Sequence, residues 1–401
     1  MTILERFLTY VSYDTQSDPD SNTYPSTLKQ HKLGEELVRE LKELGIDNAY
    51  KDEYGYVYAI LEGEMNKKIG LISHMDTATE LSGKNVKPRI IDKYDGKDII
   101  LPNQMIISPK DFPFLNDLIG DTLVTTSGDT LLGADDKAGI AIIMSILDEL
   151  IKSNKPHPTI YVAFTPDEEI GRGTAHFNYD FFKVDFAYTL DGAAIDNIDY
   201  ENFNAASLKV TIKGNSIHPG EAKGKLINSQ ELAFKFHSLL PTNEKPEYTE
   251  KYEGFFHLTN MNGEVENTVL KYIIRDHDTD RFNQRKEFVK GLSNKLNQEL
   301  GGEYIQIEIK DSYYNMADLI KPHPEIIDIP KKALAMYNIK AKSEPIRGGT
   351  DGAMLSYGGI LCPNLGTGSY NHHGARELAS ITKMTLLKDI LVTMFTTSEL
   401  F

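Results

Sequence analysis

Two adjacent carboxylates, Glu168 and Glu169, follow an apolar run at residues 159–164 that is typical of a buried parallel strand. In an open α/β sheet, ligands bind beyond the carboxyl ends of such strands. Like charges side by side repel each other, and burial raises the cost. A divalent cation would remove this conflict, because one glutamate could coordinate it while the other acts as a base on a metal-bound water. Taken alone, the pair could also be a solvated acidic turn that opens a helix.

Further acids and histidines recur along the chain, most of them directly after other expected strands. These candidates are His74, Asp76, Asp135, Asp191, His372 and His373. Imidazole and carboxylate groups without thiolates suit zinc, manganese or cobalt in a hydrolytic site. Two histidines and three carboxylates are about enough for a bridged centre with two metals roughly 3.5–4 Å apart.

Each motif by itself has a simpler structural interpretation. The His74–Asp76 pair could be a buried hydrogen bond, although Asp76 could also orient His74 and raise its basicity. Adjacent Asp135 and Asp136 could cap a helix. Ordinary turns or polar loops could account for Asp191-Gly192 and His372-His373. These interpretations do not explain why the candidates recur together at strand ends, and that recurrence predicts a metal site.

The composition sets broad limits on the class of protein. The chain has 401 residues, 40% hydrophobic and 25% charged, which is ordinary for a globular protein and long enough to favour two domains. A net charge of −16 argues against binding to nucleic acid or anionic membranes. The single cysteine, Cys362, permits no intrachain disulfide and favours a reducing, cytoplasmic compartment. The N-terminus has the pattern of an amphipathic helix and lacks that of a signal peptide, and no apolar run approaches the ~20 residues of a membrane span.

The order of expected elements indicates an α/β fold with an insertion. Strands and helices alternate up to residue 204, which predicts a mostly parallel sheet with helices on both faces. Residues 78–121 are expected to be a hairpin excursion or a surface loop. Residues 205–315 then follow the order β-α-β-β-α-β of a ferredoxin-like domain. We therefore expect one domain built from residues 1–204 and 316–401, interrupted by a second at 205–315.

Motifs across nearly the whole chain resemble, in order, those of the M20 family of metallopeptidases. They are Ser73–Thr77, Leu132–Gly139, Thr165–Gly171, Thr189–Gly192, His218–Gly220, Ala222–Lys225, Tyr272–Asp276, Arg347–Ala353 and His373–Gly374. The resemblance implies a zinc-dependent α/β catalytic domain with the ferredoxin-like insertion as a lid. Within the family, the chain is most similar to aminopeptidases that act on tripeptides.

The resemblance also implies a metal ligand set for two Zn²⁺ per subunit, in which Asp135 bridges both ions. The two sites are completed by these pairs: His74 with Asp191, and Glu169 with His373. The peptide bond between Asp135 and Asp136 would be cis, a costly feature of the kind that persists at functional sites. We choose His373 over His372 because it immediately precedes Gly374, as the ligand does in the family motif.

Further roles concern catalysis and the substrate. The resemblance implies that Asp76 orients the ligand His74 and that Glu168 is the general base for a water bound by both zinc ions. The candidate contacts to a short peptide are His218, Arg275 and Arg347. A guanidinium binds a peptide's C-terminal carboxylate bidentately, although surface ion pairing is the alternative for each arginine. His218 could donate to the oxyanion when the lid closes.

Two other functions remain open at this point. Another M20-type hydrolase, such as a dipeptidase, a carboxypeptidase or an N-acyl amino-acid deacylase, would use the same metals with a different pocket. A non-catalytic metal- or peptide-binding module is the second alternative. The presence of Glu168 beside five ligands argues against such a module, because binding alone does not need a base. The sequence does not indicate the oligomeric state.

Overall fold

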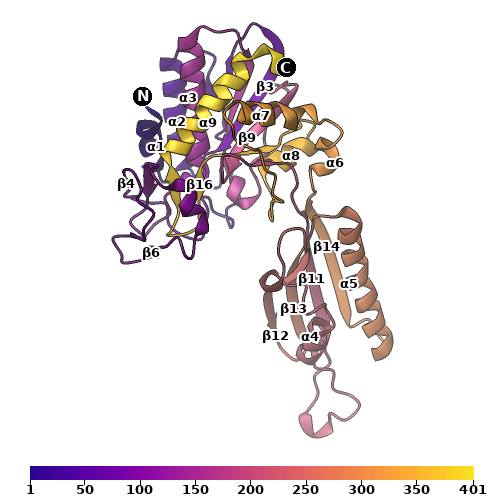
Figure 1. The fold of residues 1–401 in the computed structure, drawn as a ribbon. Helices are drawn as coiled ribbons and strands as arrows, with labels where there is room; N and C mark the ends of the chain where they lie inside the picture. Colours follow the sequence, from indigo (N-terminus) through magenta and orange to yellow (C-terminus); the bar gives the residue numbers. More distant parts are fainter. The chain divides into compact units, whose positions relative to one another are not determined.

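The computed structural model describes residues 1–401, which divide into two compact units that are described separately here (Figure 1). Unit 1 comprises Met1–Tyr200, Asp318–Glu344 and Thr350–Phe401, and unit 2 comprises Glu201–Ala317 and Pro345–Gly349. The short segment Pro345–Gly349, which carries Arg347, therefore belongs with the inserted unit although it lies far beyond it in the sequence. No helix in the structure is both long enough and apolar enough to cross a membrane.

The main sheet of unit 1 has seven strands in the order β1-β2-β8-β3-β9-β15-β10. Their bounds are Tyr50–Lys51 (β1), Val57–Leu61 (β2), Pro158–Thr165 (β8), Met65–His74 (β3), Phe186–Gly192 (β9), Asn364–Gly366 (β15) and Ile198–Asp199 (β10). The four central strands, β8, β3, β9 and β15, run parallel, and antiparallel strands flank them on both sides. The expected α/β class is confirmed. The sheet is mixed, and its central parallel strands are formed by the apolar runs of the sequence.

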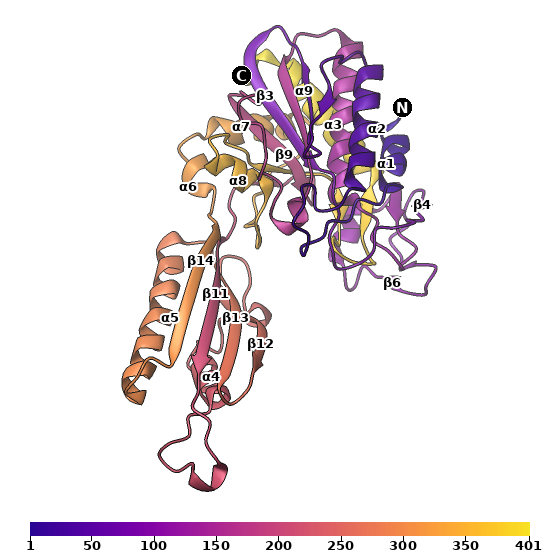
Figure 2. The same ribbon diagram turned by 180° about the vertical axis from the view of Figure 1, so that it is seen from behind.

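Helices and loops cover both faces of this sheet (Figures 1 and 2). The helices of unit 1 are α1 (Ile3–Val11), α2 (Gln30–Glu43), α3 (Ala134–Ser153), α7 (Glu325–Met336), α8 (Asp351–Tyr357) and α9 (Ile381–Thr396), and the short α6 (Ala317–Ile320) follows the last strand of unit 2. The larger core includes residues of α1, α2, α3, α7 and α9, and the core on the other face includes Phe182 and Leu355 of α8. Gly70 of β3 faces the second core, where a Cβ atom would lie 2.6 Å from the Phe182 ring. That contact is too close for any larger residue.

A second, smaller sheet in unit 1 has the order β16-β17-β7-β4. Its strands are Ser369–Tyr370 (β16), Leu378–Ser380 (β17), Leu123–Thr125 (β7) and Arg89–Ile91 (β4), with a hairpin of Ile99–Ile100 (β5) and Ile106–Ile107 (β6) beside them. Residues 78–121, expected to be irregular, thus contain strands and a 3₁₀ turn at Pro113–Leu118 with a small core of their own. Strands of two or three residues are too short to produce a recognisable alternation. Pairing of β17 with β7 brings the C-terminal loops beside the segment that leads into α3.

Unit 2 contains the predicted β-α-β-β-α-β order. Its elements are β11 (Asn204–Lys213), α4 (Ser229–Ser238), β12 (Phe255–Gly263), β13 (Asn267–Asp276), α5 (Thr279–Leu300) and β14 (Ile305–Tyr313). The four strands form an antiparallel sheet in the order β12-β13-β11-β14. Alternate residues of β11, namely Leu208, Val210 and Ile212, pack with Phe236 of α4 and Leu296 of α5 in one core. The alternation of apolar and other residues in this strand is therefore the pattern of a sheet with helices on one face.

Candidate metal centre

Three neighbouring parallel strands deliver most of the predicted site residues to one edge of the main sheet. His74 is the last residue of β3, Glu168 and Glu169 form a 3₁₀ turn (Glu168–Ile170) just after β8, and Asp191 lies near the end of β9. Asp135 lies at the start of α3, where its motif could cap a helix, and not directly after a strand as expected for most of the candidates. The expected cis peptide bond between Asp135 and Asp136 is present.

Asp135 stands between two histidine–carboxylate pairs. Its Oδ1 is 2.9 Å from His74 Nε2, and its Oδ2 is 3.4 Å from His373 Nε2. His74 Nε2 is also 3.5 Å from Asp191 Oδ1, and His373 Nε2 is 2.9 Å from Glu169 Oε2. We call His74 and Asp191 with Asp135 Oδ1 the buried lobe, and His373 and Glu169 with Asp135 Oδ2 the open lobe. One carboxylate thus serves two separate groups of nitrogen and oxygen donors.

Asp76 connects the buried lobe to the turn that carries both glutamates. His74 Nδ1 lies 3.1 Å from the Asp76 carbonyl oxygen and 3.4 Å from its carboxylate. The same carboxylate accepts the backbone N–H groups of Glu168 (2.9 Å) and Glu169 (3.2 Å). A proton on Nδ1 donated to Asp76 leaves the Nε2 lone pair directed at the site, which is the tautomer a metal ligand needs. Asp76 can therefore orient His74 and fix the base at the same time.

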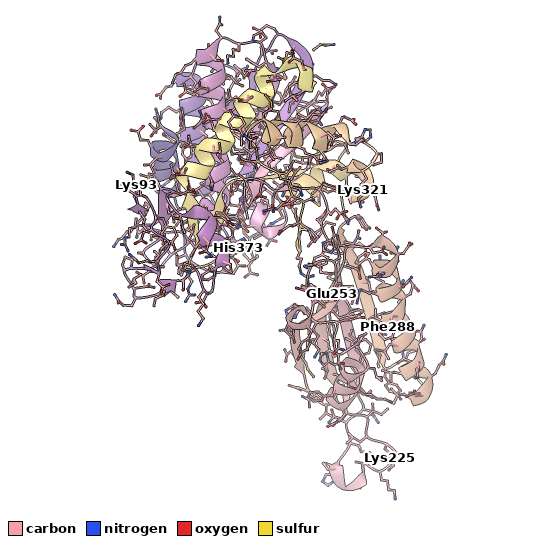
Figure 3. The ribbon with its side chains drawn as sticks, in the orientation of Figure 1. Lys93, Lys225, Glu253, Phe288, Lys321 and His373 are labelled. Atoms are coloured by element: carbon pink, nitrogen blue, oxygen red, sulfur yellow. The ribbon has the colours of Figure 1, made fainter.

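The two adjacent histidines have different partners. His373, labelled in Figure 3, contacts Glu169 and Asp135 through Nε2 and lies 3.4 Å from Glu80 through Nδ1. His372 Nε2 is 2.8 Å from Ser369 Oγ, and its Nδ1 is 3.5 Å from Asp135 Oδ2. Both imidazoles approach Asp135 Oδ2, and the Nε2 atom of His373 also contacts Glu169, whereas that of His372 faces Ser369. This geometry favours His373 as the ligand.

Sequence reasoning missed several side chains that hold the site in place. Asp167 has a left-handed backbone, and its carboxylate accepts hydrogen bonds from the Ser26 backbone N–H (2.7 Å), the Ser26 hydroxyl and Gln30 Nε2 (2.7 Å). Asp167 directly precedes Glu168, so this network anchors the turn that carries both glutamates. The available signal was an aspartate in a turn, since Asp tolerates that backbone conformation. Glu80 and Glu377, also missed, offered no local pattern at all.

The ionisable groups of the site perturb one another strongly. Burial and the charge of Asp191 raise the pKa of Glu168 well above its usual value. Burial and the charge of Asp135 raise the pKa of Glu169 to about 8. Hydrogen bonds to Asp135 and Glu169 raise the pKa of His373 to about 11. Burial lowers the pKa of His74, but Asp191 and Asp135 outweigh burial and raise it well above normal. Without a metal, bound protons therefore offset the repulsion between these carboxylates. A divalent cation could replace those protons.

The donor atoms fit a metal. Glu169 Oε1 is buried and has no hydrogen-bond partner, a costly state that a cation would relieve. Ligand atoms of His74, Asp135 and Glu169 lie within 4.8 Å of one another, as do those of His74, Asp136 and Asp191. Asp136 is the weaker candidate, because its oxygens already accept the backbone N–H groups of His74 (3.3 Å) and Gly139 (3.2 Å).

The three candidate substrate contacts lie in unit 2. Arg347 packs over the rings of Phe203 and Phe255 and donates to the carbonyl oxygens of Lys251 (2.7 Å) and Glu253 (3.0 Å). Arg275 donates to backbone carbonyls within the unit and lies over the Tyr313 ring. His218 is exposed in a loop, residues 214–228, that projects beyond one end of the unit 2 sheet, where Lys225 is labelled in Figure 3.

Comparisons with known proteins agree with this architecture. Residues 200–303 match the family model described as the peptidase dimerisation domain of M20 proteins, and residues 122–236 match that of the M42 glutamyl aminopeptidases. Peptidase T from Bacillus subtilis (strain 168) is 52% identical over 396 residues, with 97% of each chain covered.

Solved structures show the same fold. A crystal structure described as a tripeptidase from Staphylococcus aureus matches with a TM-score of 0.78 at 22% identity, covering 98% of this chain and 97% of that one. A dinuclear metal-binding peptidase of the M20 family from Bacillus subtilis matches with a TM-score of 0.65 at 13% identity, covering 98% and 96%. On the sequence identity to its relatives over almost the full length, the chain belongs to the peptidase T family of M20 peptidases.

Proposed function

We propose that this protein is a two-zinc aminopeptidase that removes the N-terminal residue of tripeptides. The observation that carries the proposal is the position of Asp135, whose two oxygens face two separate histidine–carboxylate pairs. Membership of the peptidase T family and the description of a structural neighbour as a tripeptidase support the substrate class. A dinuclear neighbour of the M20 family supports the count of two metals.

In the proposed centre, His74 and Asp191 would hold one ion, Glu169 and His373 would hold the other, and Asp135 would be shared between them. When bound, the ions would polarise the scissile carbonyl and make water acidic enough to attack near neutral pH. The chain's own contribution is to fix these donors at the edge of a rigid sheet. Asp76 helps to fix His74 through its contacts with the Nδ1 atom of the imidazole.

Glu168 is the proposed general base. Its backbone N–H donates to Asp76, which fixes the backbone position from which its side chain extends. It takes a proton from the attacking water and delivers that proton to the nitrogen of the leaving amine, a role typically worth about 10²–10⁴ in rate. The neighbouring Glu169 lies within 2.9 Å of His373, which suits a ligand and leaves Glu168 for the proton transfer.

Arg347 and Arg275 are the proposed contacts to the peptide's C-terminal carboxylate, and His218 to the oxyanion. In this structure the arginines donate to backbone carbonyls, so binding a carboxylate requires an exchange of these partners. The exchange is favourable because a guanidinium–carboxylate pair is charge-assisted and bidentate. We also place the protein in the cytoplasm, which the buried free thiol of Cys362 supports.

The test is hydrolysis of trialanine, dialanine, tetra-alanine and N-acetyl-trialanine by the zinc-loaded protein, with a chelator control. We expect release of alanine from trialanine alone, and its loss on chelation. Glu168→Gln should retain both metals and lose turnover by about 10²–10⁴-fold. Preferential cleavage of the dipeptide or the acetylated peptide would move the protein to another M20 activity, and normal turnover by Glu168→Gln would remove the assigned base.

A further inference from the structure

Glu377 is a buried carboxylate whose two oxygens are both bonded to backbone. Its side chain lies just before β17, and the residue is 1% exposed. Its Oε2 accepts the N–H groups of Leu132 (2.7 Å) and Gly133 (2.8 Å), and its Oε1 accepts the N–H of Asp135 (3.0 Å). Since both oxygens face the backbone, the carboxylate is not placed as a metal ligand.

Of these three N–H groups, that of Asp135 lies in the first turn of α3, and those of Leu132 and Gly133 lie in the segment just before the helix. The first N–H groups of a helix have no partner within it, and they are usually satisfied by a side chain just before the helix. At α3 the preceding residue is Gly133, with φ of 77°, and no local side chain caps the helix. From a distant part of the chain, Glu377 supplies an acceptor for the N–H of Asp135 and holds the segment that leads into the helix. Because one of these donors is the N–H of Asp135 itself, Glu377 fixes the backbone from which the bridging carboxylate extends.

The backbone of Glu377 is hydrogen-bonded to the loop that carries His373. Its own backbone N–H donates to the carbonyl of Gly374 (3.1 Å), the residue directly after His373. Asn371 Nδ2 closes the same loop with a hydrogen bond to the carbonyl of Arg376 (3.2 Å). One residue therefore connects the loop that carries His373 with the helix start that carries Asp135. His373 belongs to the open lobe alone, and Asp135 is shared by both lobes.

We propose that Glu377 is a positioning residue that sets the separation of Asp135 and His373 and thereby the affinity of the open lobe for its metal. The inference rests on the proposed two-metal function. The buried lobe depends on it less, because His74 and Asp191 extend from adjacent strands, β3 and β9, of the main sheet. Partners that orient metal ligands are typically worth 10–100-fold in metal affinity.

The variant Glu377→Gln tests this role, because an amide keeps the size of the side chain but has a single acceptor atom. Zinc affinity is measured by competition with a chromophoric chelator, which resolves two successive binding events. We expect the zinc affinity of the weaker binding event to fall about 10–100-fold. The affinity of the tighter event should change much less. The matched control is Glu40→Gln, at another buried carboxylate (3% exposed), which is bonded to Arg6 and Tyr10. The control should lower thermal stability and leave both zinc affinities unchanged.

Placing Glu377→Gln in a His373→Ala background assigns the effect to one lobe. If Glu377 acts through the open lobe, the double variant binds its remaining zinc as tightly as His373→Ala does. If Glu377→Gln does not fold, Glu377→Asp replaces it, since it keeps the charge and withdraws the oxygens by one methylene. The proposal is overturned if the Glu377 variant lowers stability as Glu40→Gln does without changing zinc affinity, or if both events weaken equally. A wild-type protein that binds fewer than two zinc ions would instead contradict the proposed function.

Discussion

The two lobes of the candidate centre contain the same chemistry in different surroundings. The side chain of His74 in the buried lobe is 2% exposed, and its partner Asp76 is fully buried. The side chain of His373 in the open lobe is 42% exposed, and its partner Glu80 is 58% exposed. A histidine, a carboxylate and an orienting acid thus occur twice. The histidine and the orienting acid differ in exposure between the lobes, whereas the carboxylates do not follow this difference, since the side chain of Asp191 is 14% exposed and that of Glu169 is 5% exposed. From the exposed histidine we expect the open lobe to bind its metal less firmly than the buried lobe.

The difference follows from the elements that carry each lobe. β3 and β9 are central strands with packed cores on both faces, so His74 and Asp191 are held by packing. His373 extends from a loop, and that loop is held by a few hydrogen bonds, among them Arg376 Nε to the carbonyl of Ile106 (3.0 Å). A packed core resists displacement in all directions, whereas single hydrogen bonds are individually weak.

The largest effect is expected at the residue that the two lobes share. Asp135→Ala removes a ligand from both lobes, so we expect loss of both zinc ions and of all metal-dependent activity. Asp129→Ala, at an exposed carboxylate on the segment before α3, is the control and should bind two ions normally. Metal content by mass spectrometry under native conditions measures both. Retention of one tightly bound ion by Asp135→Ala would show that the lobes do not share a ligand.

A second comparison concerns the stability of the metal-free protein. His74→Ala leaves the buried carboxylates around it without their positive partner, a change that typically costs about 3–5 kcal/mol. His373→Ala removes a half-exposed partner of Asp135 and Glu169, whose charge the solvent screens more, so we expect a smaller loss of stability. Denaturant unfolding of the two variants with chelator present measures the contrast. Equal losses of stability would contradict the distinction between a buried and an open lobe.

The acids that contact the two histidines, Asp76 and Glu80, should also differ in their effect on zinc affinity, with the larger effect in the buried lobe. Asp76→Ala removes the support of His74 and the acceptor for the N–H groups of Glu168 and Glu169, so we expect zinc affinity to fall about 10–100-fold. Glu80→Ala breaks one exposed contact, worth at most about 1 kcal/mol or about fivefold. Zinc titrations compare the two variants directly. An effect of Glu80→Ala as large as that of Asp76→Ala would mean that exposure does not weaken the orienting contact.

A further expected effect is a pH dependence of zinc binding at the open lobe. In the metal-free protein the pKa of Glu169 is raised to about 8 and that of His373 to about 11. A metal requires ionised Glu169 and neutral His373, so it must displace protons. Its affinity rises with pH by roughly 100-fold per pH unit below about 8, where both groups lose a proton, and by roughly tenfold per pH unit between about 8 and 11, where only His373 does. Calorimetry in buffers of different ionisation enthalpy counts these protons. Binding without proton release would contradict the proton-linked pair.

Some of the site could be predicted from the sequence because its residues follow long apolar strands. The runs before His74, Glu168 and Asp191 are central parallel strands, and such strands place their carboxyl ends side by side. Asp135 could be recognised as a candidate and as part of a helix start, which the structure confirms, but its motif alone fits an ordinary helix cap as well as a metal ligand. The resemblance to a family, and not periodicity, supplied its bridging role.

The supporting contacts were beyond the reach of sequence patterns. Glu377 meets its three donors only because β17 pairs with β7, and strands of three residues leave no periodic signal. The left-handed backbone of Asp167 depends on Ser26 and Gln30, which are distant in the sequence. The inserted unit was easier to predict, since its strands have nine or ten residues and alternate clearly.

The most direct test of a shared two-metal centre is a crystal structure of the zinc-loaded protein with anomalous data collected at the zinc absorption edge. We predict two anomalous peaks about 3.5–4 Å apart, with Asp135 bound to both, His74 and Asp191 at one, and Glu169 and His373 at the other. A single peak, two peaks without a shared aspartate, or an ion bound by His372 in place of His373 would contradict this account.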